Sequence, residues 1–440
     1  MCVRSMAAPE RTARLKNLAK VFFILFFVWI LLVAAWANIH LEMIQAKSPR
    51  NFPFGVFLDS NGAPYTQDFS YNVLFLKGIR EGIVSRPYVL ENQEKLMRHM
   101  APNLNFGLSH AYSPVTFVLL FPLLGLPGQN IYLIYTILGA TGTLFLLYFY
   151  LLPKVESPVQ LYAMALAVIG VCLTAAFATG QSTLITTPAL AALWALLQKK
   201  APNALTRDIL IAFLFWVLCL KPNVAMIPLF LLLGAQSWRA LSIAVLLLLF
   251  TWTATAGYYG GWWQGLEDYF ALLSQYEPVR FPAFIRRGDD SAIVHFLSKY
   301  DPSLSHHLFL LDRALFITVN LGLVLARWFG RITASEHFQG AIWAFLLVSP
   351  YLLGSEYWIV VLLIVEGSFF AVNRPFSAAF KLFLLGGMVY FRLGVNAPVD
   401  FSFPCKWLLF FWIVTQALLE RFHRKEWSVL EPRLTKNPVS

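Results

Sequence analysis

Long apolar runs follow one another along almost the whole chain, and about 17 to 25 such residues are what an α-helix needs to cross the hydrocarbon core of a bilayer. The sequence holds twelve runs of this kind, some shortened by proline or glycine. They are 21–41, 130–152, 159–177, 184–197, 208–220, 224–234, 240–258, 311–329, 340–350, 357–372, 379–391 and 405–419. The pattern predicts an all-α, polytopic integral membrane protein with about 12 transmembrane helices.

Composition leads to the same class of protein. Of the 440 residues, 58% are hydrophobic and 13% are charged, which leaves too few polar side chains to cover a soluble domain. The net charge of +11 lies in short Lys and Arg clusters between apolar runs, a distribution that orients helices and argues against a nucleic-acid partner. The four cysteines are scattered, so they predict neither a disulfide framework nor a metal site.

One further apolar run, 112–127, decides the topology, because counting it as a span inverts every later helix. If it does not cross, the basic N-terminus and the later clusters share the cytoplasmic side, as the positive-inside rule requires. Those clusters are Lys154, Lys199 with Lys200 and Arg207, Arg239, Arg327 with Arg331, Arg374, and Arg421 with Arg424 and Lys425. We therefore expect 112–127, broken by Pro114 and Pro122, to lie at the outer interface.

This topology predicts a basic cytoplasmic N-terminus (1–20), a main transmembrane module (21–372), C-terminal transmembrane helices (373–420) and a cytoplasmic tail (421–440). The same topology places two long loops, 42–127 and 259–310, on the external side, and we expect them to carry interfacial helices. The cytoplasmic loops are short. Loops of that length are uncommon without a function. The chemistry is therefore expected on the outer face.

Asp68 is an acid among aromatic residues in the first external loop, just ahead of an expected helix over 71–82. A carboxylate held among rings at a membrane surface can have a raised pKa and act as a base toward a hydroxyl. The alternative is a helix cap or a solvated loop acid. Asp59, Glu81, Glu91 and Glu94 share the loop, and nothing local distinguishes them from that alternative.

Lys221 interrupts an otherwise continuous apolar stretch together with Pro222. An ionisable residue at membrane depth is a candidate functional residue, here one suited to an anionic lipid phosphate. An interfacial lysine in a short connecting loop is the alternative. Gln181, in another external turn, offers an amide for a sugar or for a helix start.

The remaining candidates lie in the two long loops. Arg286 and Arg287 could contact phosphate, although a charge cluster in a loop is usually solvated. His110, Tyr112 and Tyr88 could contact a sugar or simply pack at the interface. No metalloprotease, nucleotide-binding or dinucleotide-binding motif is present, so no cofactor and no metal are expected.

Taken in order, these features resemble family 87 of the GT-C glycosyltransferases, polytopic enzymes with mannosyltransferase members. The resemblance runs over most of residues 15 to 372 and rests on the order and spacing of short motifs. These are Asp68-Phe69-Ser70-Tyr71, Arg86-Pro87-Tyr88, Tyr112-Ser113-Pro114, Gly180-Gln181, Lys221-Pro222, Trp238-Arg239 and Ser349-Pro350.

The resemblance implies an outward-facing site that takes its sugar, with mannose as the family-level expectation, from a polyprenyl-phosphate donor. Asp68 would be the general base on the acceptor hydroxyl, Lys221 would neutralise the departing phosphate, and Gln181 would position a substrate. Tyr71 lies in the first-loop motif and is grouped with the substrate-positioning residues. This chain departs from the family at Glu356, which stands where a histidine is expected and bears on acceptor, sugar and activity.

The expected function is therefore sugar transfer to a glycolipid or glycan acceptor at the outer face of a plasma or inner membrane, with inversion at the anomeric carbon. Two alternatives remain open. A transporter or flippase for a lipid-linked substrate would explain the many helices and Lys221, although not the two long external loops. An inactive scaffold of the same fold would explain Glu356.

Overall fold

The computed structural model describes residues 13–21, 25, 28, 56–58, 64–100, 112–169, 181–199, 203–275, 305–349, 358–366, 375–390 and 404–416. In these ranges the chain is helical apart from one short hairpin, which confirms the all-α class at that level. The hairpin pairs β1 (Val56–Leu58) with β2 (Pro64–Thr66) in antiparallel register. It was not predicted, and the β-branched and aromatic residues in its strands account for it.

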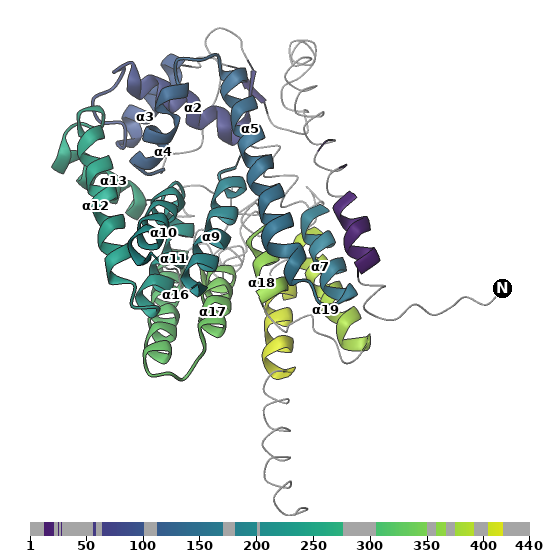
Figure 1. Ribbon diagram of the computed structural model, residues 1–440. Helices are drawn as coiled ribbons and strands as arrows, with labels where there is room; N and C mark the ends of the chain where they lie inside the picture. Colours follow the sequence, from purple (N-terminus) through teal and green to yellow (C-terminus); the bar gives the residue numbers. More distant parts are fainter. Residues whose placement is uncertain are drawn as a thin grey trace, which may run out of the picture.

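The segments around the first predicted external loop gather at one end of the molecule. Figure 1 shows α2 (Gln67–Arg80), α3 (Leu90–Met100) and α4 (Pro114–Leu120) together at the top, beside α13 (Trp262–Gln275). The 3-10 turn η2 (Phe121–Leu123) ends α4. Lys77 of α2 donates a hydrogen bond to the carbonyl of Leu126, at 2.9 Å, which ties α2 to the chain just beyond η2.

Most of the long apolar helices lie between residues 128 and 259. The first of these is α5 (Gly128–Phe145), which continues through the π-helical segment η3 (Leu146–Leu151) into α6 (Leu152–Lys154). The others are α7 (Pro158–Ile169), α9 (Thr183–Gln198), α10 (Ala204–Leu218), α11 (Pro222–Gly234) and α12 (Trp238–Thr255), which ends in the 3-10 turn η4 (Ala256–Tyr259).

Local sequence explains where these helices start. Asn203 caps α10, because its side-chain oxygen accepts from the backbone N–H groups of Leu205 and Thr206. Pro222 occupies the first turn of α11, where its missing N–H removes no helical hydrogen bond. Pro222 therefore fixes where the short turn between α10 and α11 ends.

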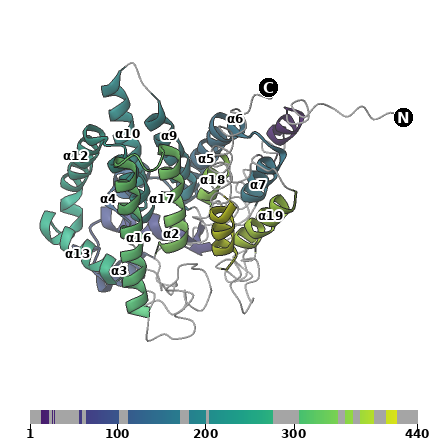
Figure 2. The ribbon, with the colours of Figure 1, turned by 90° about the horizontal axis from the view of Figure 1, so that it is seen from below.

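The second half adds α16 (Ser305–Trp328), α17 (Ala334–Val348), α18 (Val360–Glu366), α19 (Pro375–Tyr390) and a helix over residues 404–416. The turn between α16 and α17 lies at the opposite end from α2, α3 and α4 (Figure 1). Thr333 and Glu336 form a capping box that starts α17 there. Seen from below, α7 and α19 lie on the far side of α5 and α18 from α10 and α12 (Figure 2).

A buried carboxylate joins the two halves of the chain near the lower end of the long α5–α6 helix. Glu366, at the end of α18, accepts a hydrogen bond from the hydroxyl of Tyr150, at 2.5 Å, and pairs with the ammonium group of Lys154. The backbone carbonyl of Glu366 accepts further bonds from Ser335 and Gln339 of α17. This cluster connects η3, α6, α17 and α18.

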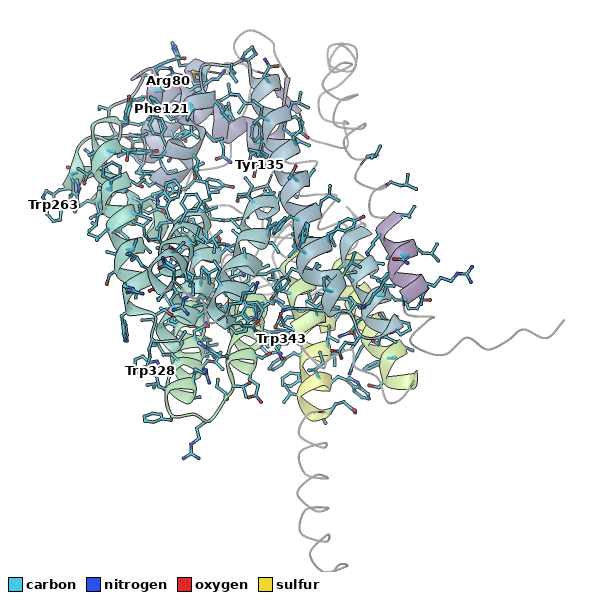
Figure 3. All side chains as sticks on the ribbon, in the orientation of Figure 1. Arg80, Phe121, Tyr135, Trp263, Trp328 and Trp343 are labelled. Atoms are coloured by element: carbon cyan, nitrogen blue, oxygen red, sulfur yellow. The ribbon has the colours of Figure 1, made fainter. Side chains whose placement is uncertain are left out.

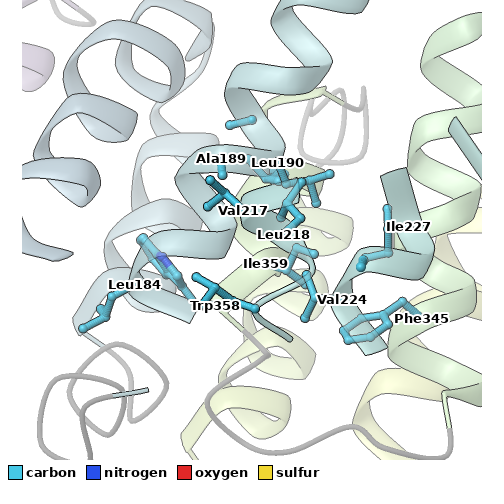
Figure 4. Close-up of a cluster of buried hydrophobic side chains, with 14 of the residues drawn as sticks. Leu184, Ala189, Leu190, Val217, Leu218, Val224, Ile227, Phe345, Trp358 and Ile359 are labelled. Carbon is cyan, nitrogen blue, oxygen red and sulfur yellow. The ribbon is translucent and has the colours of Figure 1, made fainter. Parts of the chain in front are cut away.

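The centre of the helix assembly is a continuous apolar core. Trp358, just before α18, is fully buried, and Figure 4 shows it with Ile359 among side chains of α9, α10, α11 and α17. Glycine permits a close contact of α5 with α9, because a Cβ at Gly139 of α5 would lie 3.0 Å from the Cβ of Leu184. Close approach of α5 to α9 therefore depends on that glycine.

Several helices also carry large apolar side chains on their exposed faces. The most exposed include Phe149 after α5, Leu246 and Phe250 of α12, and Phe329 at the end of α16. By length and composition, two helices of the described ranges could cross a membrane, Asn130–Lys154 and Trp238–Tyr259, and five further apolar helices are shorter. The count of about 12 spans therefore stays a prediction.

The bounds of two elements differ from those expected. α2 begins at Gln67, so Asp68 lies in its first turn and not in a loop ahead of a helix starting at residue 71. α16 begins at Ser305, inside the stretch expected as the second external loop. Both helices begin with polar residues such as Gln67 and Ser305. The apolar pattern begins only later, so a prediction from that pattern sets the start of each helix too far along the chain.

Candidate functional site

Two predicted site residues from different parts of the chain are in direct contact. Lys221 immediately precedes the first turn of α11, and Gln181 lies just ahead of α9. The Nζ of Lys221 donates a hydrogen bond to Oε1 of Gln181 at 3.2 Å. Both side chains are buried, with 5% and 6% of their surfaces exposed. The pair brings the start of α9 and the start of α11 together, with a cation between them.

The segment before α4 is fastened to the same place. The hydroxyl of Ser113 donates to the carbonyl of Cys219, at 2.5 Å, and that of Thr116 to the carbonyl of Leu220, at 3.5 Å. Tyr112, another predicted residue, precedes Ser113. Its backbone carbonyl accepts from the hydroxyl of Tyr88 at 2.9 Å, so Tyr88 holds this segment in position.

Burial keeps the Tyr88 hydroxyl protonated. Burial first, and then the neighbouring Tyr259 and Tyr269, raise the pKa of Tyr88 well above its ordinary value. The Tyr88 ring stacks on Tyr259 with ring centroids 4.8 Å apart. Tyr88 is therefore a donor that positions backbone, and the sequence interpretation of it as a residue packed among aromatics fits this geometry better than contact with a sugar.

A cavity of about 350 Å³ lies beside the Lys221–Gln181 pair. Its wall is mostly apolar, and its polar members gather where α2, α4 and α9 begin. The lining residues are Phe69, Asn72, Tyr112, Thr116, Leu119, Leu120, Leu123, Tyr135, Leu138, Gly142, Ser182, Leu184, Ile185, Pro188, Val217 and Leu220. The volume is at the lower end of the range for small-molecule sites.

The cavity wall includes one predicted site residue and sequence neighbours of three others. Tyr112 lines it directly, while Ser182 and Leu220, the neighbours of Gln181 and Lys221, line it beside the buried cation. Phe69 and Asn72 of α2 line it as well, and Asp68 precedes Asn72 by four positions, the spacing of one helical turn. Asp68 and Tyr71 are described by their backbone in α2.

The other predicted residues lie outside the described residues. They are His110, Arg286, Arg287 and Glu356. Conversely, sequence interpretation missed Asn72, Thr116 and Ser182, the polar residues of the cavity wall. The one available signal was the repetition of hydroxyl residues at 182, 183, 186 and 187 in an apolar helix.

A salt bridge ties the loop after α2 to α13, close to Tyr88. Nε and Nη2 of Arg86 donate to the two carboxylate oxygens of Asp268 at 2.8 and 2.6 Å, and Gln264 donates to the same carboxylate at 3.1 Å. The hydrogen bonds from Arg86 lower the pKa of Asp268 below its ordinary value of 3.8. The sequence interpretation did not anticipate this pair, whose members are 182 positions apart.

Asp268→Asn should loosen α13 and speed proteolysis of the loop containing Arg86, because the two parallel charge-assisted bonds are lost. The folded pKa of Asp268 is depressed, so its stabilisation is present above its ordinary pKa and is lost as pH falls through the folded value. We expect the difference in thermal midpoint between wild type and variant to be constant near neutral pH, to shrink as pH falls below about 3.8, and to vanish below the lower, folded pKa of Asp268. The exposed neighbour Glu267→Gln is the control. An equal effect of both variants would contradict the assignment.

The arrangement offers a buried cation, an amide and hydroxyl groups at the polar end of an apolar cavity. This combination suits an amphiphile with an anionic head and a hydrocarbon chain. Within the described ranges, no group of three His, Cys, Asp or Glu side chains could hold a metal ion. No family model matches the chain, and neither a curated protein nor a solved structure matches it.

Proposed function

We propose that the protein is a membrane glycosyltransferase of GT-C architecture that transfers a sugar from a polyprenyl-phosphate donor to a glycolipid or glycan acceptor. The observation that carries the proposal is the buried contact of Lys221 with Gln181 beside a mostly apolar cavity that α2, the helix bearing Asp68, also lines. A phosphate bound to a hydrocarbon chain is the class of ligand that such a cavity suits.

Exposed apolar faces support a membrane location. The span Trp238–Tyr259 has 22 residues, which corresponds to about 33 Å of helix, close to the thickness of a bilayer core. Leu246 and Phe250, midway along it, are 64% and 73% exposed, which suits contact with lipid and not with water.

Aromatic residues at the two ends support the same orientation. Trp263 lies toward one end of the molecule and Trp328 toward the other (Figure 3), and both are exposed. Trp and Tyr are enriched at the two interfaces of a membrane. Arg327 and Arg331 flank the turn at the Trp328 end, so the positive-inside rule assigns that end to the cytoplasm and the end with α2 and α4 to the outside.

α4 and η2 together suit an interfacial segment. They comprise ten residues, Pro114–Leu123, and would span about 15 Å, half of a bilayer core. The chain then turns and enters α5 at Gly128. This supports the topology in which 112–127 does not cross, and all of the basic clusters share one side.

The chemistry follows from the residues at that outer end. The acceptor oxygen attacks the anomeric carbon, its proton passes to the carboxylate of Asp68, and the bond from carbon to the phosphate oxygen breaks. The electron pair leaves with the lipid phosphate, whose growing negative charge Lys221 stabilises. Direct displacement inverts the anomeric configuration. Gln181 holds the Lys221 ammonium group in place, so its role is to position that cation.

Transfer can be tested with the full-length protein in nanodiscs, a panel of radiolabelled polyprenyl-phosphate sugars and a membrane lipid extract. We expect wild type to move label from at least one donor, mannose first, to a new product. Label that instead crosses the bilayer of a vesicle while still attached to its lipid would support a flippase. Saturable donor binding with neither transfer nor translocation would support an inactive scaffold.

The cavity gives a prediction about the hydrocarbon chain of the donor. Gly142 lines it, and a Cβ there would make ordinary contacts of 3.6 Å with the carbonyl of Leu184 and with Pro188. Gly142→Ala should therefore be neutral, whereas Gly142→Leu should project into the cavity and overpack it. We expect Gly142→Leu to lower transfer from long-chain donors about tenfold relative to short-chain donors, an overpacking effect of about 1–3 kcal/mol. Equal losses with both donor lengths would refute a chain-binding role.

A further inference from the structure

Ser182 has a buried hydroxyl without an explained structural role. It is 8% exposed, lines the cavity, and its Oγ has no hydrogen-bond partner among the residues that the structure describes. A buried hydroxyl left without a partner is destabilising, because nothing replaces the hydrogen bonds that it would make with water. Such a group in a cavity wall points to a ligand that completes it.

Helix capping does not explain this side chain. Ser182 immediately precedes α9, where a serine usually accepts from the backbone N–H groups of the first turn. Here the residue has helical backbone angles, φ −63° and ψ −12°, and in the described part of the chain its side chain makes no capping bond. The hydroxyl is therefore oriented for something other than the helix start.

The surroundings of Ser182 favour an anion. Gln181 next to it accepts from the ammonium group of Lys221, which brings a buried cation to the same end of the cavity. The first turns of α9 and α11 both begin there, and each helix start carries a partial positive charge and N–H groups without helical acceptors. A hydroxyl, a cation and two helix starts together form a site that suits phosphate.

We propose that Ser182 donates a hydrogen bond to a phosphate oxygen of an isoprenoid phosphate, which Lys221 contacts from the start of α11 and whose chain occupies the apolar part of the cavity. This inference rests on the proposed function and deepens it, because it assigns a specific residue to the recognition of the donor phosphate. The proposal assigns this phosphate contact to Ser182 and not to Thr186, which lies one turn further along α9.

Thr186 provides a matched control. It is fully buried, and its Oγ1 also has no partner among the described residues, but it is not part of the cavity wall. Ser182→Ala and Thr186→Val each remove one buried hydroxyl from the same helix. A general effect of losing a hydroxyl in α9 would appear in both variants, whereas a phosphate contact would appear only in Ser182→Ala.

The test measures binding of a polyprenyl monophosphate and of the matched polyprenol to the full-length protein in nanodiscs, with inorganic phosphate as competitor. We expect Ser182→Ala to weaken binding of the phosphate lipid about tenfold, in line with one charge-assisted hydrogen bond, and to leave polyprenol binding unchanged. Thr186→Val should bind both lipids as wild type does.

Three results would overturn the inference: unchanged phosphate-lipid binding by Ser182→Ala, an equal loss with polyprenol, or an equal loss in Thr186→Val. If inorganic phosphate at equal concentration displaces the lipid, the site binds phosphate itself, and the claim that its ligand is an isoprenoid phosphate is rejected as well. Sugar transfer is measured on the same samples. If the wild type shows no transfer but phosphate-lipid binding depends on Ser182, the transferase function is rejected and the phosphate site is kept. If the wild type transfers sugar and Ser182→Ala transfers equally well, the transferase function is kept and the role of Ser182 is rejected.

Discussion

Replacing Lys221 by methionine is expected to reduce sugar transfer by about 10²–10³-fold, the effect of removing one preorganised group that stabilises transition-state charge. Methionine keeps the apolar stem of the lysine in a position that is 5% exposed, so the helix contacts of α11 should persist. In the proposed mechanism, the lost charge is the one that stabilises the leaving phosphate. Transfer rates at saturating donor, together with the thermal midpoint of each variant, measure the two effects separately.

Two further variants make this result interpretable. Lys221→Arg keeps the cation and should retain a substantial part of the rate. Lys77→Met removes a lysine that is also at the end with α2 and that bonds to the carbonyl of Leu126, away from the cavity wall, and should leave transfer unchanged. A Lys221→Met protein that transfers at the wild-type rate would remove the cation from the mechanism. The contact with Gln181 would then be a feature of helix packing alone.

Asp68→Asn is expected to lower transfer by about 10²–10⁴-fold, the usual contribution of a general base. Asparagine has nearly the same shape and remains in the first turn of α2, so folding and donor binding should be close to those of wild type. The variant should also lose the acidic limb of the pH–rate profile, because the group that must be deprotonated is gone. Transfer and donor binding are measured on the same preparations across the pH range.

Glu81→Gln serves as the matched control for the base. Glu81 is an exposed acid of the same predicted loop and follows the other end of α2, so its replacement should preserve both rate and pH profile. An Asp68→Asn enzyme that remains active with an unchanged profile would show that another group accepts the proton. The assignment of the leaving-group cation would survive that result, since it depends on Lys221.

The sequence predicts that Gln181 and Lys221 lie on the same side, because each interrupts apolar helices at a turn and the distribution of Lys and Arg favours one side for both turns. Their direct contact at 3.2 Å is known only from the structure. The cavity beside them could not be derived in this way. Its shape depends on how closely α5 approaches α9, which is set by Gly139 against Leu184 in three dimensions.

Other parts of the site escaped prediction for related physical reasons. Apolar periodicity finds the middle of a helix better than its start, so α2 was expected to begin at residue 71, after Asp68. Arg86 and Asp268 looked like separate loop charges, because pairing across 182 positions leaves no local pattern. The sequence interpretation gave Ser182 no role, because the signal is the lack of a capping bond among the described residues, and that is visible only in the structure.

The cluster of Tyr150, Lys154 and Glu366 has a consequence for biosynthesis. Glu366 follows Lys154 by 212 positions, so at about 5–20 residues per second the ribosome needs roughly 10–40 s to supply the carboxylate after the lysine has emerged. During that interval the end of the long α5–α6 helix has no Glu366 to pair with. Completion of this part of the assembly therefore waits for α18, and in a nascent chain that stops before residue 366 the α5–α6 helix lacks the link through Glu366 to α17 and α18.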